Sequence, residues 1–116
     1  MSFTIYRMRK DVFLNLKDHF TGEEAEKATA EFKTLVGRDV VRFIVDLGAL
    51  TGYDKAARIR WQKVLMPMKS KIEKIYFIGE ATPLIRMAAS TVALAVGITM
   101  KFVKEQSDVP PALELS

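Results

Sequence analysis

The 116-residue sequence contains no cysteine and only one histidine, His19. Without thiols the chain forms no disulfide, no thiolate zinc site and no cysteine nucleophile. The most apolar stretch, residues 87–100, is shorter than the roughly 20 residues that a membrane-spanning helix needs. The first ten residues lack the long apolar core of a signal peptide. We therefore expect a cytoplasmic protein.

Motifs of common catalytic sites are missing too, including Gly-x-Ser-x-Gly and the Walker phosphate-binding loop. His19 falls in an expected loop near acidic residues, where a histidine is usually solvated rather than a general base. Asp46 and Asp54 stand at an expected strand end and helix start. They could face one crevice as an acid–base or metal pair, but a structural aspartate and a helix N-cap explain them more simply. We expect no enzyme activity, no metal and no cofactor.

Hydrophobic periodicity predicts strands that alternate with helices. The expected strands cover residues 3–9, 12–17, 40–47, 72–79 and 98–104. One helix begins at Thr21, which forms a capping box with Glu24, and stops at Gly37. Two more are expected over residues 54–68, where Pro67 ends or kinks the pattern, and 83–96, after a Thr82 cap.

The resulting order, β-β-α-β-α-β-α-β, predicts a single α/β domain with a mixed, mostly parallel five-stranded sheet and three to four helices. The opening hairpin supplies an antiparallel edge. Three main helices are too few to cover both faces evenly, so one face is expected to be partly open. We expect the domain to cover residues 1–106. Residues 107–116 are then a mobile tail or a short closing helix interrupted by Pro110 and Pro111.

The stretch "DLGALTGYDKAARIRWQ", residues 46–62, resembles the signature of the STAS fold, typified by bacterial anti-anti-sigma factors of the SpoIIAA type. In that family a strand leads to Asp-Leu-Ser-Gly-Val, and the helix starts with Asp-Ser-Ser-Gly. Here Asp46 and Leu47 match the strand end, and Asp54 matches the second aspartate. Leu50 and Thr51 lie in the middle of the expected loop, residues 48–53. The resemblance implies a fold over about residues 3–104, and its sequence match covers residues 41–57.

The chain departs from that signature where the family places its phosphorylated serine pair. Lys55 and Ala56 occupy those positions, and Ala57 replaces the glycine. Neither side chain has a hydroxyl, so the resemblance implies that the phosphorylation switch is absent or uses Thr51. In this respect the chain is similar to divergent SpoIIAA-like proteins, which keep the fold without the serine and act as interaction or lipid-related modules.

Charge is distributed unevenly along the chain, whose net charge is +4. Between Leu47 and Gly79 there are two acids and seven bases, namely Lys55, Arg58, Arg60, Lys63, Lys69, Lys71 and Lys74. A basic side attracts nucleic acid, anionic lipid or an acidic protein, although such bases also simply solvate an exposed helix. No aromatic residue is interleaved with the bases on the helix flank, which argues against nucleic acid.

We therefore interpret the chain as a non-enzymatic protein-interaction module in bacterial regulation, whose partner has an acidic surface. In the expected sheet, the loops that follow neighbouring parallel strands lie at one edge, where such folds bind ligands and partners. The expected contact residues come from these loops and from helix 54–68. They are Thr51, Tyr53, Asp54, Lys55, Arg58, Lys63, Glu80 and Thr82.

Two alternatives stay open. The same loops precede helix N-termini, which favour anions, so the chain could instead bind a small anionic or lipid-like ligand. A deep apolar pocket under helix 83–96 would favour lipid. That helix is apolar over much of its circumference, as buried helices are. Its outer face could otherwise form a homodimer or contact a membrane surface peripherally, with Arg86 at the rim.

Overall fold

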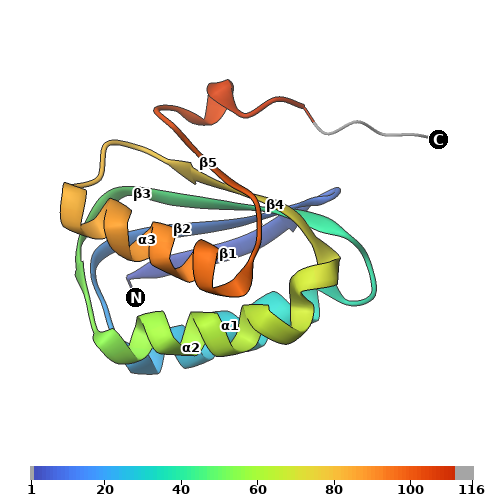
Figure 1. Ribbon diagram of the computed structural model, residues 1–116, viewed down its shortest axis with the longest axis horizontal. Helices are drawn as coiled ribbons and strands as arrows, with labels where there is room; N and C mark the ends of the chain where they lie inside the picture. The colour runs from blue at the N-terminus through green and yellow to red at the C-terminus, as the bar shows by residue number, and fades with distance from the viewer. Residues whose placement is uncertain (1, 112–116) are drawn as a thin grey trace.

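A five-stranded sheet with the order β1-β2-β3-β4-β5 forms the centre of the fold (Figure 1). The computed structural model describes residues 2–111. β1 pairs with β2 in antiparallel fashion, and β2 to β5 are parallel to one another. The strands are β1 (Phe3–Met8), β2 (Asp11–Phe20), β3 (Val41–Tyr53), β4 (Ile72–Ile78) and β5 (Met100–Val103). The predicted mixed, mostly parallel sheet and its element order are confirmed.

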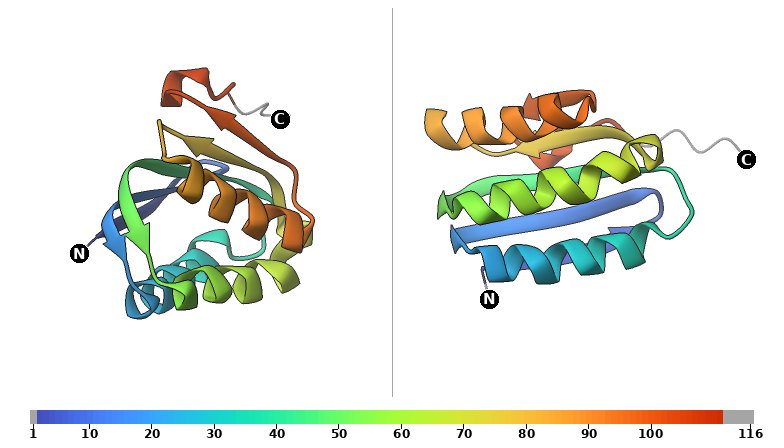
Figure 2. Two further views of the ribbon diagram at one scale, coloured as in Figure 1. Left: turned by 60° about the vertical axis from the view of Figure 1, so that its left-hand side comes forward. Right: turned by 60° about the horizontal axis from the view of Figure 1, so that its bottom comes forward.

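The three α-helices lie on one face of this sheet (Figure 2). They are α1 (Gly22–Val36), α2 (Lys55–Leu65) and α3 (Pro83–Val96). The opposite face carries no α-helix in the described part of the chain. The expectation of a partly open face is confirmed, because each parallel crossover here passes on the same side.

Strand alternation divides the apolar side chains between the two faces. Val12, Leu14 and Leu16 of β2 lie in the main core under the helices. Phe13, between them, lies on the far face in a smaller cluster with Ile44, Tyr76 and Ile78. Both placements follow the period of two that the sequence shows.

An aromatic trio ties the helices to the centre of the sheet. Phe32 of α1 lies with its ring centroid 4.5 Å from that of Phe43 of β3. Trp61 of α2 packs against both rings, at 5.5 Å from Phe32 and 5.3 Å from Phe43. All three side chains are buried, so this trio locks two helices onto one strand.

The segment after β5 turns back onto the open face of the sheet (Figure 1). A short 3₁₀ helix, η2 (Gln106–Asp108), precedes Val109, which packs on the Phe13 cluster. Arg42 Nη1 donates a hydrogen bond of 2.6 Å to the Pro110 carbonyl oxygen. Residues 112–116 of the expected tail lie outside the described residues.

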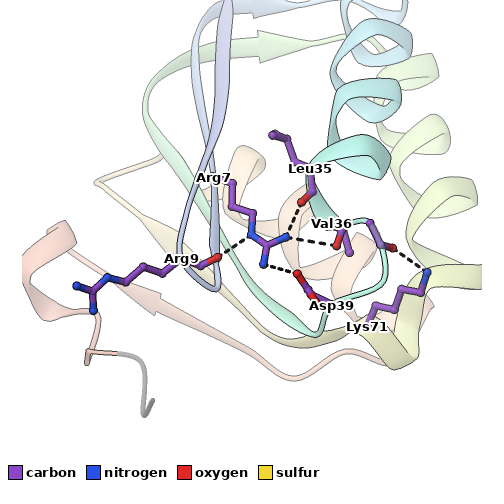
Figure 3. Close-up of polar contacts among 7 residues, drawn as sticks. Arg7, Arg9, Leu35, Val36, Asp39 and Lys71 are labelled. Carbon is purple, nitrogen blue, oxygen red and sulfur yellow. Dashed lines mark hydrogen bonds and ion pairs between the residues drawn. The ribbon is translucent and has the colours of Figure 1, made fainter. Parts of the chain in front are cut away.

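Both ends of α1 are capped by side chains. At its start Thr21 and Glu24 form the predicted capping box. At its end Gly37 has the positive φ of 57°. Arg7 Nη1 donates to the Leu35 carbonyl oxygen at 2.7 Å, and Lys71 Nζ donates to that of Gly37 at 3.0 Å (Figure 3). Two cations from distant elements thereby satisfy the free carbonyls of the last turn.

The break that Pro67 predicts within the helical pattern of residues 54–68 is confirmed. The α-helix ends at Leu65, and a 3₁₀ helix, η1 (Met66–Lys71), follows it. Pro67 sits inside η1, as the missing amide of proline ends α-helical pairing. The last strand is shorter than residues 98–104, because only Met100–Val103 pairs with β4.

The expected loop at residues 48–53 is wrong in a way that matters for the site. These residues continue β3, which pairs with the second half of β2 up to Phe20 and Tyr53. The pairing shifts register twice, between Asn15 and Lys17 and between Asp18 and His19. Each shift adds one residue to β3, so the glycine-containing stretch forms β-bulges instead of a free loop.

Candidate functional site

Thr51 and Tyr53, both at the end of β3, differ in their exposure to solvent. Thr51 is the extra residue of the second bulge, since Leu50 pairs with Asp18 and Gly52 with His19. Its side chain is exposed. Tyr53 is half-buried and packs against the main core. Thr51 is thus open to solvent, whereas Tyr53 belongs to the apolar interior beneath α2.

Asp54 occupies the N-cap position of α2 but does not cap that helix with its side chain. Its carboxylate accepts a hydrogen bond from the backbone N–H of Gly22 at 3.1 Å and lies 2.7 Å from His19 Nε2. The contacts with His19 and with Gly22 hold the pKa of Asp54 below its usual range. Asp54 was predicted to cap α2, and this was wrong for its side chain. The carboxylate instead accepts a hydrogen bond from the first residue of α1.

His19 was expected in a loop and instead lies on β2. It is exposed, and its imidazole joins the carboxylate of Asp54 at the start of α2. The parallel pairing of β2 with β3 brings these two residues together. No local pattern in the sequence indicates this contact.

Asp46 and Asp54 do not share a crevice. Asp46 alternates with Val45 and Leu47 of the core, so it lies on the sheet face away from the helices. Its Oδ1 accepts a hydrogen bond from the Gly48 N–H at 2.9 Å. Within residues 2–111, no group of three or more histidine, aspartate and glutamate side chains is arranged to hold a metal ion. The geometry offers no paired-carboxylate centre at these two positions.

The outer surface of α2 combines basic and apolar side chains. Lys55, Ile59, Lys63 and Met66 recur at helical spacing, and all four are exposed. Ile59, Lys63 and Met66 border a shallow depression together with Gln62 and Pro67. We call this surface, from Lys55 to Pro67, the α2 strip. Along this strip two exposed lysines alternate with two exposed apolar side chains.

Three other bases of this region, Arg58, Arg60 and Lys71, make hydrogen bonds within the protein. Arg58 is half-buried, and its Nη1 donates to Gln62 Oε1 at 3.1 Å. Arg60 Nε donates to Thr29 Oγ1 of α1 at 3.4 Å. Lys71 binds the end of α1. The sequence therefore overstates how many bases are free to meet a partner.

Glu80 and Thr82 lie between β4 and α3, and both are exposed. Thr82 caps α3 as predicted, with Oγ1 accepting from the Ile85 N–H at 3.4 Å. The segment between β4 and α3 and the start of α2 lie toward the same end of the molecule (Figure 1). However, β4 ends opposite Asp46, whereas β3 continues along β2 to Tyr53 (Figure 2). The segment after β4 and the start of α2 therefore follow different parts of β3.

An apolar cavity of about 100 Å³ lies between the sheet, α2 and α3. Phe43, Val45 and Phe77 of the sheet form part of its wall. On the helix side, Trp61 and Ala89 line it. This cavity lies under the helix expected over residues 83–96, and the sequence pattern does not show its volume, which depends on how closely α3 approaches α2.

The outer face of α3 is more exposed than its composition indicates. The helix buries Ile85, Ala93 and Val96, whereas Leu84, Met87 and Leu94 are exposed by 66 to 73%. The prediction of a largely buried helix was wrong for this face. No helix among the described residues has the length and apolarity to cross a bilayer.

Comparisons with known proteins support the fold. No family model matches the sequence, and no curated protein matches it either. Among solved structures, a DUF3478-family protein with a SpoIIAA-like fold from Shewanella loihica PV-4 superimposes with a TM-score of 0.71 and 17% identity. The match covers 91% of this chain and 87% of that one.

Two structures of SpoIIAA are similar as well. The phosphorylated form of this Bacillus cell fate determinant gives a TM-score of 0.68 with 15% identity, covering 90% of this chain and 94% of that one. The unphosphorylated anti-sigma factor antagonist gives 0.64 with 15% identity, covering 90% and 92%. These matches show that the chain has the SpoIIAA-like fold, which is the STAS fold that the loop sequence resembles.

Proposed function

Because the chain has the SpoIIAA-like fold, we propose that it is a non-enzymatic protein-interaction module of bacterial, cytoplasmic regulation, like the anti-sigma factor antagonist with that fold. The α2 strip carries the proposal. It places exposed Ile59 between exposed Lys55 and Lys63, with exposed Met66 following Lys63, so apolar contacts alternate with positive charge. The partner surface that fits is acidic with an apolar centre.

The remaining predicted contact residues extend this surface. Thr51, Tyr53, Asp54 and Arg58 lie at the end of β3 and the start of α2, beside the strip. The segment between β4 and α3, which carries Glu80 and Thr82, supplies a second contact at the same end of the molecule (Figure 1). Separation of Asp46 from Asp54 by the sheet supports a role without catalysis, since that pair was the leading candidate for acid–base chemistry.

This module would work without the serine phosphorylation that the resemblance to the STAS signature implies. Lys55 and Ala56, at the serine positions, carry no hydroxyl. Regulation of the interaction then depends on the amount of protein, on a ligand, or on the exposed hydroxyl of Thr51.

Affinity capture from the source organism, after nuclease treatment, tests the proposal. We expect one protein to co-purify with the wild type and to be lost with Lys55→Glu/Lys63→Glu. Glutamate at position 55 suits the positive start of α2, whereas glutamate at position 63 replaces the basic residue of its last turn, so the melting temperature of the variant is compared with that of the wild type first. A matched variant, Lys27→Glu/Lys104→Glu, changes two exposed lysines elsewhere and should keep the partner. Capture of no protein, or equal capture by both variants, contradicts the proposal.

A second role, the binding of a small anionic or lipid-like ligand, is favoured by one observation. The apolar cavity lies under α3, between that helix, α2 and the sheet. A ligand held there would touch the inner side of α2, whose outer side carries the strip. The two roles are therefore compatible within one domain.

A further inference from the structure

Most of the α3 side chains at the wall of the cavity between α2 and α3 are small. Ala88, Ala89 and Val92 line it from α3, beside the larger Ile85. The sheet beneath them contributes larger side chains such as Phe43 and Phe77. Alanines cannot fill the distance between two helices and a sheet, so wall atoms lack packing partners.

The volume of about 100 Å³ suits a small apolar body. Engineered apolar cavities of about 150 Å³ stay dry and bind benzene. A body of about six carbon atoms or fewer is therefore the size expected here. The apolar walls exclude ordered water, which needs several polar partners.

One charged side chain lines the cavity within residues 2–111, and it lies where the cavity reaches the surface. Arg58, Tyr53, Ala88, Ala89 and Val92 are the lining residues that are partly exposed, so they form the mouth between α2 and α3. Arg58 Nη1 donates a hydrogen bond to Gln62 Oε1. This bond uses one of the five N–H donors of the guanidinium. A guanidinium at the mouth of an apolar cavity matches a carboxylate on an apolar body.

We propose that this cavity binds a small aliphatic carboxylate, with the hydrocarbon between α2 and α3 and the carboxylate on Arg58. The inference rests on the second role above, ligand binding, and specifies its ligand class. The cavity mouth shares Tyr53 and Arg58 with the predicted partner contacts. The exposed residues of the α2 strip that carry the protein-interaction proposal, Lys55, Ile59, Lys63 and Met66, do not line the cavity, so the two proposals are tested separately. Ligand occupancy would brace the inner side of the helix whose outer side is proposed to meet that partner.

The protein carries its own optical reporter of this site. Trp61 is the single tryptophan of the chain and lines the cavity. Its fluorescence should therefore change as hexanoate fills the cavity. We would titrate the full chain with butanoate, hexanoate and 1-hexanol at constant ionic strength, with acetate as the salt control. Hexanoate should give a saturable change, bind at least tenfold more tightly than butanoate, and bind at least tenfold more tightly than 1-hexanol.

Two pairs of variants test the position and the charge. Ala89→Leu fills the cavity and should abolish the hexanoate response without lowering the melting temperature. Ala95→Leu, on the exposed side of the same helix, should leave it unchanged. Arg58→Gln should weaken hexanoate at least tenfold and leave 1-hexanol unaffected. Lys27→Gln, which removes one exposed charge from α1, should change neither affinity.

The outcomes distinguish the assignment of a carboxylate ligand from ligand binding in the cavity as such. Equal binding of 1-hexanol and hexanoate overturns the carboxylate assignment while the ligand-binding role survives. A saturable response to neither compound, or a response that persists in Ala89→Leu, overturns the cavity as a ligand site. Loss of the protein partner in affinity capture affects neither result.

Discussion

His19 Nε2 lies 2.7 Å from Asp54 Oδ1, and this contact joins the end of β2 to the start of α2. The other oxygen of the same carboxylate accepts the N–H of Gly22, the first residue of α1. One aspartate thus connects a strand and two helices at the end of the molecule where the proposed interaction surface begins.

Asp54→Asn is expected to lower the melting temperature at pH 7 through loss of this charged acceptor. The contacts with His19 and Gly22 depress the pKa of Asp54 in the folded state. Its contribution is therefore present above the unfolded-state pKa of about 4 and is lost as the pH falls through the folded-state value. Thermal unfolding at pH 7 and at pH 3 should show a difference from the wild type that shrinks in acid. Asp18→Asn, at an exposed neighbouring residue, should show little difference at either pH.

Glu24→Gln tests a second carboxylate at the start of α1. Hydrogen bonds from the Ser2 side chain and backbone lower the pKa of Glu24 from 4.5 to about 2, and Thr21 contributes in the same direction. Glutamine still completes the capping box, so the variant isolates the charge. The wild type should have the higher free energy of unfolding in urea above pH 4.5, and this advantage should decline between about pH 4.5 and 2. A constant difference across that range would contradict the assignment, and Glu26→Gln serves as the exposed control.

Asp11→Ala should destabilise the fold by about 3 kcal/mol, which is the lower end of the cost of breaking a buried ion pair. Arg42 Nε and Nη2 donate to the two carboxylate oxygens of Asp11 at 2.7 and 2.8 Å, and the Arg42 side chain is only 9% exposed. Removing Asp11 leaves that guanidinium without its carboxylate. The double variant Arg42→Met/Asp11→Leu should lose less than the single one, as measured by urea unfolding. A single-variant loss below about 1 kcal/mol would show that solvent replaces the carboxylate.

Gly79→Ala should destabilise the protein by more than about 1 kcal/mol, because two independent effects combine. Gly79 has a φ of 99°, and a Cβ there would lie 2.7 Å from the Cα and the N of Gly48. Gly37→Ala is the control, since its φ of 57° is also positive but the nearest atom to its Cβ is 4.0 Å away. Equal melting temperatures for the two variants would mean that the backbone of Gly48 moves away from a Cβ at position 79 at little cost.

Salt should slow the association of the protein with the partner captured through the α2 strip. Lys55 and Lys63 are exposed, so their attraction for an acidic surface is screened at high ionic strength. Raising sodium chloride from about 50 to 500 mM should reduce the association rate by roughly tenfold and change the dissociation rate less. An association rate that does not change with salt would show that charge does not contribute to recognition.

The elements that the sequence predicted correctly are those specified by local chemistry. The capping box of Thr21 and Glu24, the Thr82 cap of α3 and the alternation of β2 all depend on residues close in the chain. The period of each segment was sufficient to give the element order and, from it, the parallel sheet.

The errors come from pairings between distant residues. Gly48 and Gly52 indicate a turn locally, yet β2 offers a paired edge that holds the same stretch as a bulged strand. The contact of His19 with Asp54 depends on that register, and the cavity depends on the distance between α2 and α3. None of these quantities is encoded within a window of ten or fifteen residues.

The capping of α1 by Arg7 and Lys71 has a consequence for synthesis on the ribosome. Lys71 follows α2 in the chain, so the last turn of α1 obtains its second cation only after more than half of the protein has been made. Until then the carbonyl oxygen of Gly37 accepts its hydrogen bond from water, and the nascent helix should fray at that end. Folding of the N-terminal half is thereby coupled to the arrival of the segment that leads into β4.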